Sequence, residues 1–524
     1  MENLDIEKHA QGLISGDQSY LLIWSGAFLA FGIWLIAAAI FGQFIGKRLP
    51  SIDKTWAKVV LFIFGIIFAL PGGFFTYKIL VPPTLIVLTG LSEDEYNVFE
   101  ELIDDFEREF RVYVNIKNVH WKDALKRLET GEDIDLITFD INGWRSRLVE
   151  ENLIEDLSKV KGLIPDSVHP ALIQNNDFGG KRFFIPFRPN VRLIFWNKEK
   201  YRKSENPTNP KWKNGCEPFQ EDFEISNGPP SSWAQVLNIA ARVDNPEVRV
   251  VVNASSSDAP LLLLELIRSA GGDPLNLLDT KSKKAIKFLR CLWPSVSPKS
   301  SYVDWRTATG FLLSGSVYFA RNWTFALTRI HKGQDLSENE TDKAVTNPFP
   351  SLGNFQVSSG LRWKDDKKTA SPKNLLGGEY LALPKTTEYK DLAKELIRFL
   401  VREDVQKRIV EKQSWPAMRL DVFPGSGNPQ EEVVPITVKG GTPPKEQISK
   451  VGSAYKWQRH FREVINEALL GAKPVPNYWW PDMPDIYGRL FSRLVKLDPR
   501  DDDLSFLTNF QNELDRLNLK ESKE

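Results

Sequence analysis

Two groups of hydrogen-bonding side chains stand at the ends of two apolar, β-rich runs of the chain, residues 84–89 and 135–139. Stretches with helical spacing separate such runs, and alternating strands and helices are typical of a doubly wound parallel sheet. Because the carboxyl ends of parallel strands meet at one edge, we expect both groups to line one site, where they could hydrogen-bond a small polar molecule. The residues concerned are Thr89, Ser92, Glu93, Asp140 and Asn142.

A second set of polar residues follows further along the chain. Arg188 lies between two extended apolar segments, residues 183–187 and 191–196, where a buried charge needs a partner. It could bind a ligand or form a salt bridge within the protein, and Glu379 or Tyr380 could play either part. The remaining polar candidates, at the end of an expected strand and in the turn after it, are Asn253, Ser257 and Asp258. For each polar candidate, a helix cap or a solvated loop tip is the alternative to ligand binding.

The sequence contains no catalytic or phosphate-binding motif of the common types. It has no HExxH, no GxSxG, no GxxxxGK and no GxGxxG after a strand. Its five histidines are scattered without metal-ligand spacing, and carboxylate pairs such as Asp104-Asp105 lie on an acid-rich helical face. We therefore assign no catalytic, metal-binding or cofactor-binding residue and expect a protein that is not an enzyme. A glycosidase built from carboxylates at distant positions is the alternative.

Two uncharged apolar runs, Leu21–Gly46 and Val59–Tyr77, precede this polar body. Each is long enough to cross about 30 Å of hydrocarbon at about 1.5 Å per helical residue. The first run is longer than the apolar region of a cleaved signal peptide, and acidic residues precede it. We expect two transmembrane helices, over residues 20–46 and 59–80; buried core helices are the alternative.

The charge between the runs predicts how such a hairpin is oriented. Four basic residues and one acidic residue, Asp53, lie in the connecting segment 47–58. Because short cytoplasmic segments are enriched in Lys and Arg, we expect this loop in the cytoplasm. The tail of residues 1–19 and the large body from residue 84 onward then lie on the extracytoplasmic side, and the protein is a two-pass protein of the cell membrane.

The composition narrows the possible partners. The formal net charge is zero, so no broad basic field predicts nucleic-acid binding. The two cysteines, Cys216 and Cys291, are too few for a disulfide framework and could be paired or free. Sixteen tryptophans are numerous enough to suggest binding of ring-shaped polar solutes as well as core packing.

Helices and strands alternate again in the second half of the body. We expect a helix after Ser231 or Ser232, a strand over 248–253, a helix over 260–270 and a short strand over 317–320. The fold class is therefore α/β, with a second α/β lobe behind the first.

An ordered series of sequence segments resembles a known family. These segments include "VFEELIDDFEREF", "DIDLITFDINGW", "DFGGKRFFIPFRPNVRLIFWNKEKY", "FLLSGSVYFARNW", "LLGGEYLALPKTTEYKDLAKELIRFLV" and "SWPAM". Together they resemble the extracellular solute-binding proteins of ABC importers, and most of all the sugar-binding group similar to maltose-binding protein. The resemblance runs from about residue 84 to about residue 517.

The resemblance implies a two-lobed periplasmic-binding-protein fold of type II behind the two transmembrane helices. Lobe one would comprise residues 84–188 and 380–425, and lobe two residues 192–376 and 426–520. The chain would cross between the lobes near Arg188–Arg192, near Gly377–Tyr380 and shortly after Trp415-Pro416. The family's acidic-basic pair after the strand at 135–139 is not matched, because Asp140 and Asn142 stand there.

The resemblance also implies a ligand and a function. Trp323 stands where the sugar-binding group has a stacking Trp, and Tyr478, Trp479 and Trp480 stand where it has another aromatic platform; core packing is the alternative for each. We expect a membrane-tethered protein that captures a small polar solute, most simply a carbohydrate, and passes it to ABC permease subunits. The alternatives are an extracytoplasmic sensor that signals through a membrane partner and, further off, a carbohydrate-active enzyme. The solute's identity and the oligomeric state stay open.

Overall fold

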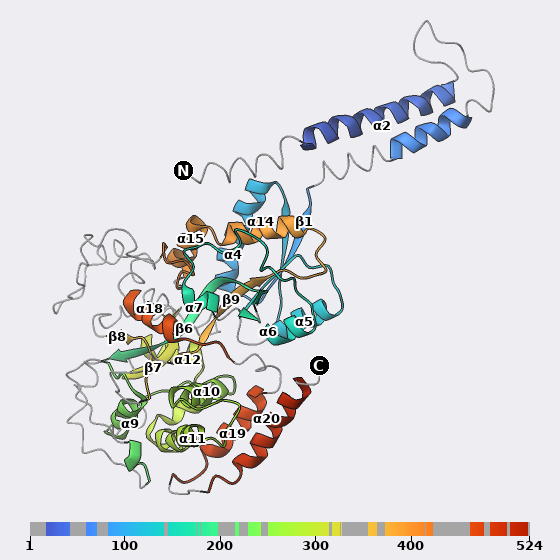
Figure 1. Cartoon of the computed structure of the whole chain (residues 1–524). Helices are drawn as coiled ribbons and strands as arrows, with labels where there is room; N and C mark the ends of the chain where they lie inside the picture. The colour runs from blue at the N-terminus through green and yellow to red at the C-terminus, as the bar shows by residue number, and fades with distance from the viewer. Residues whose placement is uncertain are drawn as a thin grey trace, which may run out of the picture. The chain divides into compact units, whose positions relative to one another are not determined.

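The computed structural model describes most of the chain (Figure 1). The described residues are 17–41, 59–70, 82–140, 145–174, 177–178, 180–197, 215–219, 229–242, 250–313, 317–324, 326, 355–363, 373–413, 415–422, 462–475, 483–499 and 503–521. The chain divides into two compact units, residues 1–85 with 106–115 and residues 86–105 with 116–524.

The first unit contains α2 (Asp17–Phe41) and a second helix over residues 59–70. The two helices approach each other closely at Gly32 and Gly65, since a Cβ built on Gly65 would lie 2.9 Å from the Gly32 carbonyl oxygen. The rings of Phe28 and Phe68 stack at 5.8 Å. Among the described residues, no helix has both the length and the apolar character needed to cross a membrane. The expected cytoplasmic loop and the end of the second apolar run, residues 71–80, lie outside the described residues.

The central sheet is mixed, with the strand order β2-β1-β3-β9-β6-β7 and with β8 paired to β6. β1 and β3 are parallel, with Thr89 opposite Thr138, as the sequence predicts. Beyond the segment from which the sequence predicts a parallel sheet, the sheet becomes mixed, because β9 returns antiparallel to both of its neighbours, β3 and β6. The strands are β1 (Thr84–Thr89), β2 (Tyr113–Asn118), β3 (Leu136–Asp140), β6 (Ile185–Asn197), β7 (Phe319–Trp323), β8 (Phe355–Ser358) and β9 (Leu376–Ala382), and β4 (Asp177–Phe178) pairs with β5 (Lys181–Arg182) in a separate hairpin.

β6 is one continuous strand rather than the two extended segments that the sequence predicts. Its first part, through Val191, pairs with β9, and from Arg192 onward it pairs with β7. Pro189, which lacks an N–H group, and a register shift between Pro186 and Arg188 are accommodated inside this strand. A single strand therefore carries both Arg188 and Arg192.

Gly378 on β9 allows the two crossing strands to come into contact. Its φ of +102° is disfavoured for residues with a side chain. A Cβ on Gly378 would also meet the backbone of the facing strand, at 2.6 Å from the Asn190 nitrogen and 2.7 Å from the Pro189 Cα. The contact between β6 and β9 at this point requires glycine.

Helices cover the sheet and enclose two apolar cores. One core gathers around Leu88, Ile137, Phe184 and Tyr380, and the larger one surrounds α10, α11, α19 and α20, which pack side by side in Figure 1. The helices are α4 (Glu93–Phe110), α5 (Trp121–Glu129), α6 (Arg145–Glu150), α7 (Pro170–Gln174), α9 (Trp233–Arg242), α10 (Ala259–Ser269), α11 (Thr280–Leu292), α12 (Trp305–Leu313), α14 (Lys390–Leu400), α15 (Glu403–Gln413), α18 (Arg462–Gly471), α19 (Met483–Leu494) and α20 (Leu507–Glu521), with shorter 3-10 turns over Glu217–Phe219, Trp293–Ser295 and Pro298–Tyr302.

A disulfide joins Cys216 to Cys291 inside the larger core, which resolves the alternative that the sequence leaves open. It fixes a short turn to α11, and Phe219 in that turn packs edge-on against Phe288, with ring centroids 5.3 Å apart. The bond closes a loop across a sequence separation of 75 residues.

Replacing both cysteines by serine should lower the free energy of unfolding by about 4 kcal/mol, because the unfolded chain regains the freedom of that long loop. Urea denaturation of the oxidised wild type and of the double variant measures the difference. An equal midpoint for the two proteins would show that the disulfide does not stabilise the fold.

Gly378→Ala should lower the free energy of unfolding by about 3 kcal/mol, because it adds backbone strain and a clash with β6. Gly131→Ala is the matched control. Gly131 has a φ of +72° but open space around it, so its substitution should cost only about 1 kcal/mol. Equal losses in the two variants would contradict the close approach at Gly378.

Candidate ligand-binding site

Arg188 is the centre of a buried polar cluster where β6 meets β9. Its side chain is 1% exposed and forms an ion pair with Glu379, the residue directly opposite in the register of the two strands. Arg188 Nε donates to Glu379 Oε2 at 3.1 Å, and Thr138 Oγ1 donates to the same oxygen at 3.0 Å. The structure thus shows Arg188 in a salt bridge, one of the two alternatives that its sequence position leaves open.

Two further residues hold Arg188 and were missed in the sequence. Gln413, the last residue of α15, accepts a hydrogen bond from Arg188 Nη1 at 2.7 Å. The ring of Trp415 lies over the guanidinium, 4.6 Å from its centroid to the Arg188 Cζ. The only available signal was the "SWPAM" segment, which resembles the family but does not indicate a contact more than 200 residues away. We call Arg188, Glu379, Thr138, Gln413 and Trp415 the Arg188 cluster.

Burial sets the protonation of the carboxylate in this cluster. Desolvation raises the pKa of Glu379, and the negative charge of Glu95 raises it further, while Arg188 opposes both effects. Proton uptake by Glu379 weakens the ion pair at the point where the strands cross.

The predicted polar group of the first sheet edge gathers beside this cluster. Asp140 ends β3 opposite Glu379 and is exposed, and Glu93 is exposed in the first turn of α4. Ser92 and Glu95 form a capping contact, since the Ser92 N–H donates to Glu95 Oε2 at 2.9 Å. Thr89 is buried, and among the described residues its hydroxyl has no hydrogen-bond partner. Asn142 lies outside the described residues.

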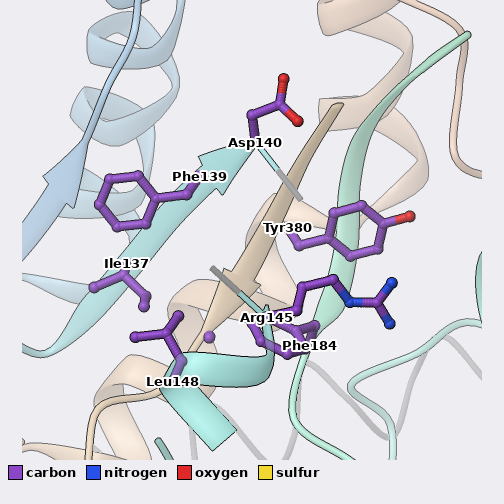
Figure 2. Close-up of a pocket in the computed structure, with 8 residues that line it drawn as sticks. Ile137, Phe139, Asp140, Arg145, Leu148, Phe184 and Tyr380 are labelled. Carbon is purple, nitrogen blue, oxygen red and sulfur yellow. The ribbon is translucent and has the colours of Figure 1, made fainter. Parts of the chain in front are cut away.

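On the opposite face of the sheet lies a small cavity of about 20 Å³, shown in Figure 2. That volume suits one water molecule and is far too small for a sugar. Tyr380 points into this region beside Arg145, whereas the Asp140 carboxylate points away from both. The lining residues are Ile137, Phe139, Asp140, Arg145, Leu148, Phe184, Tyr380 and Ala382.

Arg145 is a basic residue after β3 that the sequence analysis missed. Its guanidinium lies over the rings of Phe178, at 4.8 Å, and Phe184, at 5.8 Å. Burial lowers its pKa to about 10, so the side chain stays charged at neutral pH. Arg145 lies five positions after Asp140 in the chain, so a basic side chain does follow β3, three positions beyond Asn142.

The second polar cluster forms on the other part of β6. Arg192 Nη2 donates to Asp258 Oδ1 at 2.6 Å, and Arg192 Nη1 lies 3.8 Å from Glu265 Oε2. Arg321 on β7 forms an ion pair with the same Glu265, and Asp258 immediately precedes α10. We call Arg192, Asp258, Glu265 and Arg321 the Arg192 cluster.

Two tryptophans stack on the guanidinium groups of the Arg192 cluster. The Trp323 ring centroid lies 4.8 Å from the Arg192 Cζ, and the Trp233 ring centroid lies 5.0 Å from the Arg321 Cζ. Desolvation lowers the pKa of both arginines and raises the pKa of Asp258, whose ionised form Arg192 favours. The sequence indicates Asp258 as a candidate, but it does not indicate its partner Arg192 or the second carboxylate, Glu265 on α10.

The placement of Trp323 differs from the prediction. β7 extends to Trp323 instead of ending at residue 320, because its register continues to the Arg192–Trp323 pair. Trp323 is 8% exposed, so only a small part of the ring reaches the surface. Asn253 is buried, and its amide oxygen has no hydrogen-bond partner in the described part of the chain. Tyr478, Trp479 and Trp480 lie outside the described residues.

The raised pKa of Glu379 predicts a pH dependence of stability. The folded state keeps this proton at pH values where the unfolded chain, with the ordinary pKa of 4.5, has lost it. The contribution is therefore fully present below about 4.5 and is lost as the pH rises through the raised pKa. We expect the difference in unfolding free energy between wild type and Glu379→Gln to fall across that range.

Urea denaturation at a series of pH values measures this difference. A difference between wild type and Glu379→Gln that stays constant or rises with pH would contradict the assignment.

Comparisons with known proteins identify a family of binding proteins. The model of the bacterial extracellular solute-binding protein family matches residues 101–432. A "probable ABC transporter-binding protein" of Deinococcus radiodurans is 24% identical over 301 residues, which cover 54% of this chain and 62% of that relative's own length.

Solved structures of other solute-binding proteins share the fold. A solute-binding protein of Thermotoga lettingae bound to α-D-tagatose has a TM-score of 0.59 at 18% identity, covering 83% of this chain and 99% of its own. Maltose-bound MalE3 of T. maritima has a TM-score of 0.58 at 17% identity, covering 83% and 100%. These likenesses confirm the expected two-lobed periplasmic-binding-protein fold. The family model matches more than half of the chain, and the chain therefore belongs to the bacterial extracellular solute-binding proteins.

Proposed function

We propose that this protein captures a small polar solute, most simply a carbohydrate or polyol, and delivers it to an ABC importer. The observation that carries the proposal is the pair of buried arginine–carboxylate clusters on β6, each with a tryptophan over its guanidinium. A sugar presents hydroxyl groups and apolar C–H faces, which such charged pairs and aromatic rings can bind. Family membership supports the transport role.

The proposed contacts come from both parts of β6 and from the neighbouring strand ends. Trp323 would offer the edge or free face of its ring, while Arg192 occupies the other face. The other residues proposed to contact the solute are Ser92, Glu93, Asp140, Arg188, Asn253, Asp258 and Glu379, with Asn142, Tyr478, Trp479 and Trp480 as further candidates. Tyr380 is not among them, because its side chain lies on the opposite face of the sheet, beside the small cavity.

The proposed mechanism is closure of the two lobes around the solute. Open and closed states of such proteins differ by only a few kcal/mol, so a solute that contacts both lobes favours the closed state. The backbone would bend where β6 and β9 pair at Pro189 and Gly378, and we place the lobe boundaries near there, at residues 188–192 and 377–380. Permease subunits would recognise the closed form.

We further propose that the N-terminal helices anchor the protein in the cell membrane as a hairpin. The two uncharged runs support this idea, as do exposed apolar side chains such as Trp24, Ile40 and Leu70, each more than 60% exposed. A disulfide persists in oxidising compartments, which favours an extracytoplasmic body. The basic segment 47–58 would then face the cytoplasm.

A thermal-shift screen of the full chain in detergent, against neutral sugars and polyols, tests the solute class. A true ligand at about 100 times its Kd should stabilise the protein by about 2.7 kcal/mol. If no sugar or polyol raises the Tm, the carbohydrate proposal is wrong.

Trp323→Phe should weaken binding of the sugar found in that screen by about tenfold, because a smaller ring covers less of its C–H face. Trp363→Phe is the matched control, since Trp363 packs against Phe219 and Phe288 in the core. Titration calorimetry measures both affinities. Unchanged affinity in Trp323→Phe would remove Trp323 from the site.

A further inference from the structure

We infer that Gln413 is a positioning residue that couples the Arg188–Glu379 pair to the first turn of α4. This inference rests on the proposed function, in which that turn presents Ser92 and Glu93 to the solute. Gln413 itself is half-buried and is not proposed to touch the solute.

The side-chain amide of Gln413 bridges two segments that are far apart in sequence. Its Oε1 accepts from Arg188 Nη1 at 2.7 Å, and its Nε2 donates to the backbone carbonyl oxygen of Glu95 at 3.1 Å. Glu95 in turn accepts from the Ser92 N–H at 2.9 Å and from the Ser92 hydroxyl at 2.7 Å. Hydrogen bonds therefore link Glu379 through Arg188 and Gln413 to the Glu95 backbone, and the Glu95 side chain continues the connection to Ser92.

Only an amide satisfies both partners of this bridge. A guanidinium can only donate, so Arg188 requires an acceptor, and a backbone carbonyl can only accept, so Glu95 requires a donor. A glutamate at position 413 would keep the contact to Arg188 but would turn an oxygen toward the Glu95 carbonyl. It would also place a third negative charge beside Glu95 and Glu379, whose mutual repulsion already raises the pKa of Glu379.

The bridge fixes the first turn of α4 from two directions. Ser92 caps the turn from its N-terminal side, where the Tyr96 N–H also donates to the Ser92 carbonyl oxygen at 2.8 Å. Gln413 holds the same turn from α15, the helix that ends beside Trp415. A shift of Arg188 when β6 and β9 bend would therefore be transmitted to Ser92 and Glu93. The same bridge lets a solute held by that turn favour one position of Arg188.

Hydrogen–deuterium exchange without any ligand tests the physical link. Gln413→Met keeps the length of the side chain and removes both hydrogen bonds, so amides of residues 92–98 should exchange about tenfold faster. Gln406→Met is the matched control, because Gln406 lies on the same helix and its side-chain amide donates to the carbonyls of Phe187 and Leu400 rather than to the first turn of α4. Gln406→Met should leave exchange in residues 92–98 unchanged.

Affinity for the sugar found in the thermal-shift screen tests the functional consequence. We expect Gln413→Met and Gln413→Glu each to weaken binding about tenfold, and Gln406→Met to leave the Kd unchanged. Gln413 acts through the turn that Ser92 caps, so the two substitutions should not be additive. Ser92→Ala should weaken binding by less than threefold in the Gln413→Met background, which is less than it does in wild type.

The outcomes separate this inference from the proposed function. Unchanged exchange at residues 92–98 in Gln413→Met overturns the link, whatever the protein binds. Faster exchange together with an unchanged Kd, or with full additivity of Ser92→Ala and Gln413→Met, overturns the positioning role. If no sugar binds to wild type, the proposed function fails, while the exchange experiment still decides whether Gln413 holds α4.

Discussion

The burial of two arginines on one strand is the constraint on which the rest of the fold depends. Arg188 and Arg192 are almost completely inaccessible to water, and leaving even one of them unpaired would cost several kcal/mol. Each therefore requires a carboxylate from another element, Glu379 from β9 for Arg188 and Asp258 at the start of α10 for Arg192. These pairs specify the register of β6 against β9 and the docking of α10 on β6 and β7, and β6 belongs to both arrangements.

Features that depend on near neighbours in sequence could be predicted. β1 and α10 follow from apolar spacing, and the Ser92–Glu95 contact joins two residues only three positions apart in the chain, the spacing of a capping box. The sequence pattern also placed Asp140 at a strand end, although it showed neither that Glu379 lies opposite Asp140 nor that β9 runs antiparallel. Strand direction is set by where the chain returns from its second half, and local spacing carries no such information.

Features that depend on long-range pairing could not be predicted. Arg192 falls in an apolar run that reads as ordinary alternation, so nothing nearby indicates that it needs Asp258, 66 residues away. Gln413 was missed for the same reason, because its partners Arg188 and Glu95 precede it by 225 and 318 residues. β7 was drawn too short because Arg321 and Asn322 are polar, yet both are buried by partners on other elements.

The pairing of these charges bears on what the site can select. Arg188, Arg192 and Arg321 each have a carboxylate partner within the protein before any solute arrives. A solute bound beside these clusters need not supply a charge to neutralise them, so a neutral molecule meets no unpaired arginine there. Its hydroxyl groups would bind only at hydrogen-bonding positions that the ion pairs leave unused. Whether a hydroxyl reaches such a position depends on the shape of the solute rather than on its charge. Discrimination among neutral solutes would then follow from how rigidly each guanidinium is held, and stacking on Trp415 and Trp323 restricts both Arg188 and Arg192.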